Sequence, residues 1–223
     1  MSPAGGAAGT IVVLNGSPRS GKSSIAAALQ GSSDVLWLNL GVDAFAAMTP
    51  ARLRPGIGLR PGGERPDLED AVVLLFDALY SAVVAWSRAG RNVVVDVGHH
   101  DDYSEPLGIL TRTARALEDL PAHFVGVRCP VEVIMARRDA DPGADGGGGY
   151  ATTGPDGSIP DVVLRWERAV HDPGVYDLEV DTSTSSADAC AEAILRRVRE
   201  GAPVAFAALA TAGGHKGAGG PRP

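Results

Sequence analysis

The protein has 223 residues, a formal net charge of −7 and 44% hydrophobic residues. That length and hydrophobic content favour one domain with a sizeable core, and a charged content of 21% argues against general disorder. The excess of acidic over basic residues is not the charge pattern of a general nucleic-acid binder. Two cysteines make no disulfide framework, no apolar run reaches the roughly 18 residues of a membrane helix, and the N-terminal residues lack a secretory signal pattern. We therefore expect a cytoplasmic protein without nucleic-acid or membrane partners.

Short apolar, β-branched runs alternate along the chain with amphipathic stretches, which favours alternating strands and helices. In chain order, we expect a strand at 10–15, a helix to about residue 30, a strand at 35–40, a short helix after 43 and a helix at 67–88. These are followed by a strand at 92–97, a helix at 104–117, a strand at 123–128, helices at 130–138 and 161–171, a strand at 177–180 and a helix at 186–199.

This alternation predicts an α/β fold of the P-loop kinase type, with three layers (α/β/α) around a five-stranded parallel sheet. We expect one domain over residues 1–205, with mobile loops at about 49–66 and 139–160, and a disordered tail over residues 206–223. Ligands of such folds bind beyond the carboxyl ends of the strands, so the polar residues at those ends are the functional candidates.

Residues 16–23, with the sequence GSPRSGKS, match the P-loop pattern of two glycines followed by lysine and serine. The match follows an apolar strand and precedes a helix, so a turn that merely joins the two is a poor explanation. Backbone N–H groups and the helix N-terminus converge there on phosphates. We expect Lys22 to reach the β- and γ-phosphates and Ser23 to ligate Mg²⁺. The expected nucleotide-binding residues of this loop are Gly16, Ser17, Pro18, Arg19, Ser20, Gly21, Lys22, Ser23 and Ser24.

Two aspartates follow strands. Asp43, in the sequence GVD, can accept a proton from an attacking hydroxyl, but it is equally suited to cap a helix that begins at Ala44. Asp96 ends the third strand and can hold Mg²⁺ through water, like a Walker B aspartate, or orient the acceptor. The spacing leaves these alternatives open.

His99 and His100 follow Asp96 and are candidates for hydrogen bonds to a polar acceptor. A metal site is disfavoured because adjacent residues rarely face one ion, and no cysteine or distant histidine supports zinc. The simplest interpretation of this segment is an exposed loop.

Five segments, IVVLNGSPRSGKSS, GVD, VVVD, VGVRC and VH…YDLEVDTS, occur in this order over residues 10–185. Through them the chain resembles the chloramphenicol phosphotransferase-like family of P-loop kinases. The resemblance implies ATP or GTP as donor, Mg²⁺ as cofactor, a small-molecule hydroxyl as acceptor and Asp43 as general base. It also implies that Arg137 lies on a helix that closes over the phosphates, with Arg138 assisting or replacing it; the alternative is a solvated helix face. Thr182 and Ser183 are candidates for contacts to the nucleotide base.

The chain departs from the family pattern in two segments. The family usually has further basic residues after the arginine helix, whereas here none occurs before Arg165, so closure differs or Arg19 compensates. The turn over residues 96–102 (DVGHHDD) is also unusual, and we expect the acceptor pocket to differ from those of relatives.

Together these features predict an O-phosphotransferase that moves the γ-phosphate of ATP or GTP to a hydroxyl of a small antibiotic, chloramphenicol-like, nucleoside or sugar-bearing, and so inactivates it. One alternative is a kinase of another metabolite, such as a nucleotide, a sugar or a shikimate-like acid, because four arginines over residues 52–65 can bind an anionic acceptor. Another is a nucleotide-dependent regulatory binding module. The sequence is compatible with a homo-oligomer.

Overall fold

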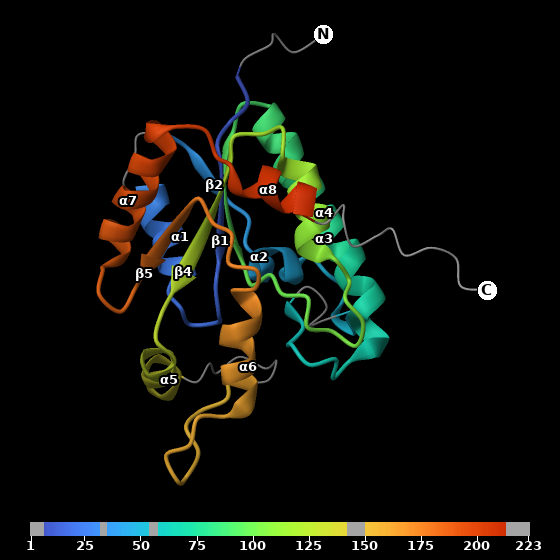
Figure 1. Ribbon diagram of the computed structural model, residues 1–223, viewed down its shortest axis with the longest axis vertical. Coiled ribbons are helices and arrows are strands. Elements are labelled where there is room, and N and C mark those ends of the chain that lie inside the picture. The colour runs from blue at the N-terminus through green and yellow to red at the C-terminus, as the bar shows by residue number, and fades with distance from the viewer. Residues whose placement is uncertain (1–6, 32–34, 54–57, 142–149, 213–223) are drawn as a thin grey trace, which may run out of the picture.

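The computed structural model describes residues 7–31, 35–53, 58–141 and 150–212. Its centre is a sheet of five parallel strands in the order β2-β3-β1-β4-β5 (Figure 1). The strands are β1 (Ile11–Asn15), β2 (Trp37–Asn39), β3 (Asn92–Val97), β4 (Ala122–Arg128) and β5 (Leu178–Asp181). The expected five-stranded parallel sheet is therefore confirmed.

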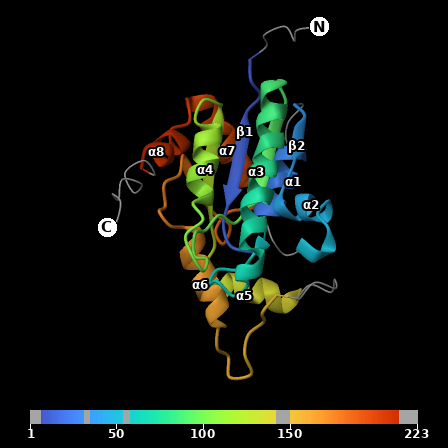
Figure 2. The same cartoon turned by 90° about the vertical axis from the view of Figure 1, so that its right-hand side faces the viewer.

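Helices cover both faces of this sheet, which confirms the three-layer architecture. On one face lie α1 (Lys22–Gly31) and α7 (Ala187–Glu200), and on the other α3 (Pro66–Arg88), α4 (Ile109–Leu117) and α8 (Ala205–Ala212) (Figure 1). Two helices, α5 (Val131–Ala140) and α6 (Asp161–Val170), lie beyond the carboxyl ends of the strands (Figure 2). The short α2 (Val42–Ala47) and a 3₁₀ turn at Ala51–Leu53 follow β2.

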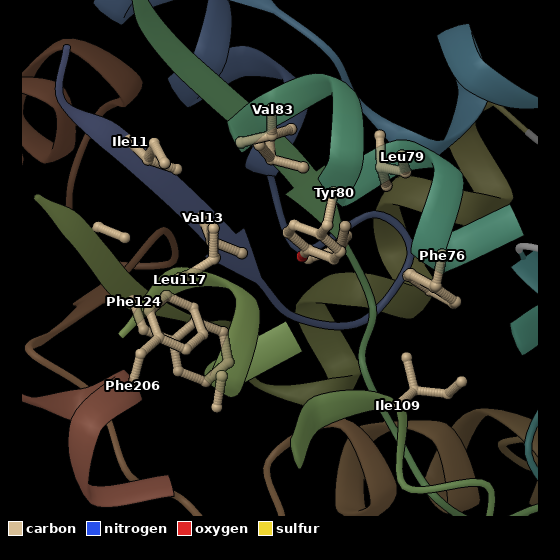
Figure 3. Packing of buried hydrophobic residues seen from close by; sticks show 14 of the residues in the cluster. Ile11, Val13, Phe76, Leu79, Tyr80, Val83, Ile109, Leu117, Phe124 and Phe206 are labelled. Carbon is tan, nitrogen blue, oxygen red and sulfur yellow. The ribbon is translucent and has the colours of Figure 1, made fainter. Parts of the chain in front are cut away.

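The alternation of side chains along β1 divides the core in two. Ile11 and Val13 pack with the helices α3, α4 and α8, whereas Val12 and Leu14 pack with α1 and α7. Because both faces of this central strand are covered, all of its residues are buried, and they are apolar from Ile11 to Leu14. Figure 3 shows the first of these clusters, in which Phe124 of β4 meets Phe206 of α8.

The C-terminal helix corrects one expectation. The tail expected to be disordered from residue 206 instead forms α8 as far as Ala212, and residues 213–223 lie outside the described part of the chain. Phe206 is 2% exposed and Leu209 is 6% exposed, because both pack on the sheet core beside α4. The helix therefore closes the hydrophobic core over β4.

Helix α4 also begins later than expected, at Ile109 and not at residue 104. Gly108 adopts a left-handed backbone conformation (φ 65°), and Asp101 Oδ1 accepts hydrogen bonds from the N–H groups of Leu107 and Gly108. These bonds hold the preceding residues in a loop. In the described part of the chain, no helix combines the length and apolar character of a membrane span.

The two segments expected to be mobile are only partly described, because residues 54–57 and 142–149 lie outside the described ranges. Their mobility stays a prediction.

Candidate active site

The phosphate-binding loop connects β1 to α1, and its shape depends on two glycines. A Cβ atom at Gly16 would lie 2.5 Å from the carbonyl oxygen of Val127, so a larger residue cannot fit there. Gly21 adopts φ +98° and packs against Thr182, which a side chain would crowd. Both glycines of the motif are therefore required by the backbone.

Lys22 lies inside this loop. Its ammonium Nζ donates hydrogen bonds to the carbonyl oxygens of Gly16 (3.0 Å) and Ser17 (2.9 Å) and lies 3.6 Å from Asp96 Oδ1. The side chain is almost fully buried, so the cation is fixed at the centre of the loop. A flexible point charge placed there can reach phosphate oxygens.

Ser23 and Asp96 meet at the carboxyl edge of the sheet. The Ser23 hydroxyl donates a hydrogen bond to Asp96 Oδ2 (2.6 Å), and Asp96 stands on β3 directly beside Leu14 of β1. A hydroxyl and a carboxylate side by side are the oxygen donors that Mg²⁺ prefers, with phosphates and water completing its shell. These residues therefore fit a nucleotide-bound magnesium ion.

Asp43 lies in the first turn of α2 and is exposed. The helix begins at Val42 with Gly41 as its N-cap, so the alternative that Asp43 caps a helix starting at Ala44 is wrong. A Cβ atom at Gly41 would lie 3.1 Å from the Cβ of Asp96. The start of α2 is thus packed on Asp96, which brings Asp43 to the same end of the sheet as Ser23.

Arg137 connects α5 to the phosphate-binding loop. Its guanidinium donates to the carbonyl oxygen of Arg19 (3.1 Å) and to the hydroxyl (3.1 Å) and carbonyl oxygen (2.8 Å) of Thr182. The hydroxyl of Thr182 in turn donates to the carbonyl oxygen of Ser20 (2.7 Å). In this structure Arg137 therefore binds the loop's backbone and the segment that follows β5.

Arg138 is 4% exposed, so the alternative that this arginine pair forms a solvated helix face is wrong. Its Nη2 lies 3.4 Å from the carbonyl oxygen of Pro18, and its Nε has no hydrogen-bond partner among the residues that the structure describes. Burial lowers the pKa of the guanidinium, the charges of Arg60 and Arg19 lower it further, and Tyr150 opposes them. Within the described residues, no acidic side chain lies at ion-pair distance from Arg138.

The ring of Tyr150 lies between two of these arginines, with its centroid 4.6 Å from Arg19 Cζ and 5.3 Å from Arg138 Cζ. Arg19 also pairs with Asp141 across 2.7 Å. Sequence reasoning missed Tyr150, because it follows a glycine run without periodicity. The contacts of Arg19 with Tyr150 and with Asp141, the residue that follows α5, place it beside this helix. That Arg19 compensates there for missing basic residues stays a prediction.

His99 and His100 are buried (1% and 3% exposed), so the expectation of an exposed loop is wrong for the two histidines, whereas Asp101 and Asp102 that follow them are exposed. His99 Nε2 lies 2.6 Å from the hydroxyl of Tyr80, and its backbone N–H donates to Asn15 Oδ1 (2.7 Å). Burial, with a smaller contribution from His100, lowers the pKa of His99 to about 3. His100 Nε2 lies 2.9 Å from the carbonyl oxygen of Leu59. Each ring is thus held by the protein through Nε2.

Among the described residues, no group of three or more His, Cys, Asp and Glu side chains could hold a metal ion. The oxygen pair of Ser23 and Asp96 differs from such a site because phosphates would supply the remaining ligands.

Two residues of α6 reach the site without having been expected there. The hydroxyl of Ser17 donates a hydrogen bond to Glu167 Oε2, and the indole Nε1 of Trp166 lies beside Gly98. The sequence offered one signal for Glu167: it precedes His171 by one helical turn (i,i+4), which puts the two side chains on the same face of the helix. The apolar pattern of this helix favours a core position for Trp166, but the side chain is only partly buried.

The amino-acid sequence of this chain is similar to a known protein family and to a known protein. A family model described as "Chloramphenicol phosphotransferase-like protein" matches residues 9–199. A Mycobacterium tuberculosis protein, present in two strains under the name "Putative O-phosphotransferase", is 27% identical over 195 residues, which cover 79% of this chain and 76% of that protein.

Two solved structures have a similar fold. The tunicamycin resistance protein of Deinococcus radiodurans is 18% identical, with a TM-score of 0.56 over 85% of this chain and 95% of that one. Shikimate kinase from Acinetobacter baumannii is 16% identical, with a TM-score of 0.56 over 86% of this chain and 94% of that one. At these identities the likeness shows the fold alone. Because the family model spans most of the sequence and the fold agrees, the chain belongs to the chloramphenicol phosphotransferase-like family of P-loop kinases.

Proposed function

We propose that this protein transfers the γ-phosphoryl group of ATP or GTP to a hydroxyl of a small antibiotic and thereby inactivates it. The observation that carries the nucleotide part is the contact of Ser23 with Asp96 beside Lys22 at the carboxyl ends of β1 and β3. It supplies one cation for phosphates and two oxygen donors for magnesium in one place.

The residues of the site have different tasks in this mechanism. The amides of the phosphate-binding loop and Lys22 hold the β- and γ-phosphates, and Ser23 and Asp96 hold the metal. Mg²⁺, when bound, neutralises part of the charge on the triphosphate. Asp43 accepts the proton of the attacking hydroxyl, which attacks phosphorus as the bond to the leaving diphosphate breaks. Arg137 and Arg138 stabilise the charge on the transferring group.

The choice of an antibiotic as acceptor draws on the family and on the Deinococcus radiodurans protein, whose name links the fold to tunicamycin resistance. The arginine-rich loop gives limited support to an anionic acceptor instead. Arg65 is paired with Asp67 through two hydrogen bonds of 2.8 Å, and Arg54 lies outside the described residues. Arg52 and Arg60 remain exposed. We therefore favour a neutral hydroxylated acceptor. In this proposal the buried His99 and His100 support the wall of the acceptor pocket.

The test is an acceptor screen that follows the release of nucleoside diphosphate, with ATP and GTP each supplied with Mg²⁺. We expect release to rise well above background with one or more hydroxylated antibiotics, with a mass gain of one phosphoryl group on the drug. Stimulation by a sugar, nucleotide or shikimate-like acid alone supports a metabolite kinase. If no acceptor raises release above slow hydrolysis, a nucleotide-dependent regulatory module is the better explanation.

A further inference from the structure

Helix α6 contacts the phosphate-binding loop through the side chain of Glu167. The hydroxyl of Ser17, the second residue of the loop motif, is fully buried and donates its hydrogen bond to Glu167 Oε2. Ser17 and Glu167 are 150 residues apart in sequence. The side chain of Glu167 is only about a quarter exposed, at 24%.

Glu167 is itself held by a chain of polar groups. Its Oε1 lies 3.4 Å from His171 Nε2, and His171 Nδ1 lies 2.9 Å from the hydroxyl of Tyr176. Asn15 Nδ2 donates to that hydroxyl (3.1 Å) and to the carbonyl oxygen of Val170 (2.7 Å), the last residue of α6. The C-terminal end of α6 is therefore bonded to the end of β1, the strand that leads into the loop.

Ser17 is a central point of the loop because three groups bind it. Besides Glu167, its carbonyl oxygen accepts hydrogen bonds from Lys22 Nζ (2.9 Å) and from the N–H of Ser20 (3.0 Å). Arg19, two residues on, has a positive φ of 72°, a strained conformation for a non-glycine residue that needs support from its surroundings. A change at Ser17 thus alters the loop that holds both Lys22 and the amides.

We propose that Glu167 is a positioning residue for nucleotide binding: by holding the Ser17 hydroxyl from α6, it keeps the phosphate-binding loop in the form that accepts the triphosphate. This inference rests on the proposed function, since it concerns the same nucleotide site. Glu167 touches the loop and not the reacting atoms, so it acts through Ser17.

The charge of Glu167 is consistent with this role. Burial alone would raise the pKa of its carboxyl, but the nearby His171 and the hydrogen bond from Ser17, with the positive charge of Arg128, leave the pKa below its usual value. Tyr176 and Cys129 are further titratable groups on which the charge of Glu167 acts. An ionised carboxylate accepts the Ser17 hydrogen more strongly than a neutral group does.

The test is a double-mutant cycle with Ser17→Ala, Glu167→Ala and both together, read out by calorimetric titration of non-hydrolysable ATP and GTP analogues with Mg²⁺. We expect each single variant to weaken nucleotide binding about tenfold, which is the low end of what the loss of a hydrogen bond to a charged group produces. The double variant should bind no more than about tenfold worse than wild type, because both changes remove one interaction.

Glu167→Gln is the conservative variant. Its amide oxygen still accepts the Ser17 hydrogen, so we expect most of the affinity to return. Glu192→Gln, an exposed carboxylate on α7, is the matched control and should bind like wild type. If Glu167→Ala fails to fold, Ser17→Ala and Glu167→Gln still carry the comparison, because both leave the apolar contacts of α6 in place.

The outcomes separate this inference from the proposed function. Wild-type protein that binds an analogue while Glu167→Ala binds it equally well overturns the inference alone. Losses that add to about a hundredfold in the double variant overturn it as well, because the two side chains would then act independently. Wild-type protein that binds neither analogue overturns the proposed function and the inference with it.

Discussion

Replacing Arg138 by methionine should stabilise the nucleotide-free protein and weaken nucleotide binding. Arg138 is 4% exposed, and its guanidinium carries a charge for which the described part of the chain offers no carboxylate partner. Methionine is likewise unbranched, is somewhat shorter and has no charge to bury. The two effects oppose each other because the charge is costly without an anion and useful with one.

The magnitude follows from the contacts of Arg138. The effective cost of burying an unpaired ion is several kcal/mol, of which the contact with Tyr150 offsets about 1 kcal/mol. The 3.4 Å contact with the carbonyl oxygen of Pro18 is too long to contribute much. Allowing for water and relaxation, we expect Arg138→Met to raise the free energy of unfolding by about 1–2 kcal/mol. That corresponds to an increase in Tm of about 2–8 °C for a chain of this size.

The effect on nucleotide binding has the opposite sign. Loss of one charge-assisted contact to phosphate costs about 1.5–3 kcal/mol, which is about a 10- to 100-fold loss of affinity. The assay is thermal unfolding with and without a magnesium-bound, non-hydrolysable nucleotide analogue. The variant should unfold at a higher temperature than wild type without the analogue and gain less stability from it. A variant that is destabilised without nucleotide, or that gains the full ligand-induced shift, would refute the reasoning.

Three further predictions concern the catalytic residues and the core. Asp43→Asn should lower kcat by a few orders of magnitude and leave nucleotide affinity near normal; near-normal turnover in steady-state kinetics would remove Asp43 from the mechanism. Asp96→Asn should raise the Mg²⁺ concentration for half-maximal activity about tenfold or more, because the amide keeps the contact to Ser23 but not the charge; an unchanged magnesium titration contradicts this. Phe206→Ala should lower the free energy of unfolding by about 3–5 kcal/mol in urea titrations. A loss below about 1 kcal/mol would mean that α8 adds little to the core.

The sheet was predictable because each strand has its own recognisable pattern in the local sequence. Covered on both faces, strands such as β1 and β4 are mostly apolar and stand out from the amphipathic helices around them. Helix α8 was not predictable in the same way. Its sequence AFAALATA resembles the low-complexity tail that follows, and what orders it is a tertiary contact of Phe206 with Phe124. Local propensity carries no information about such a contact.

The candidate site likewise has residues that the sequence reveals and residues that only the folded structure reveals. The phosphate-binding loop is contiguous in sequence, so its residues could be identified from the motif alone, whereas the tasks given to them stay predictions. Tyr150 and Glu167 come from distant segments, and only the folded chain shows that they meet Arg19 and Ser17. The histidine pair could not be interpreted correctly either, because nothing in the sequence GHHDD reveals that Tyr80 and the carbonyl oxygen of Leu59 lie within reach.

The burial of these histidines bears on the acceptor. The turn after β3 is tied to the loop before α3 by His100 with Leu59, and by the N–H of Gly62, which donates to the carbonyl oxygen of Asp102 (2.8 Å). Glu69 adds a further connection by accepting hydrogen bonds from Ser104. The Nε2 atoms of both rings are therefore used within the protein, whereas their Nδ1 atoms are buried without a hydrogen-bond partner in the described part of the chain. Because burial lowers the pKa of both histidines, this wall presents no histidine cation to a polyanion, and we expect a neutral molecule with a well-placed hydroxyl to suit the site better.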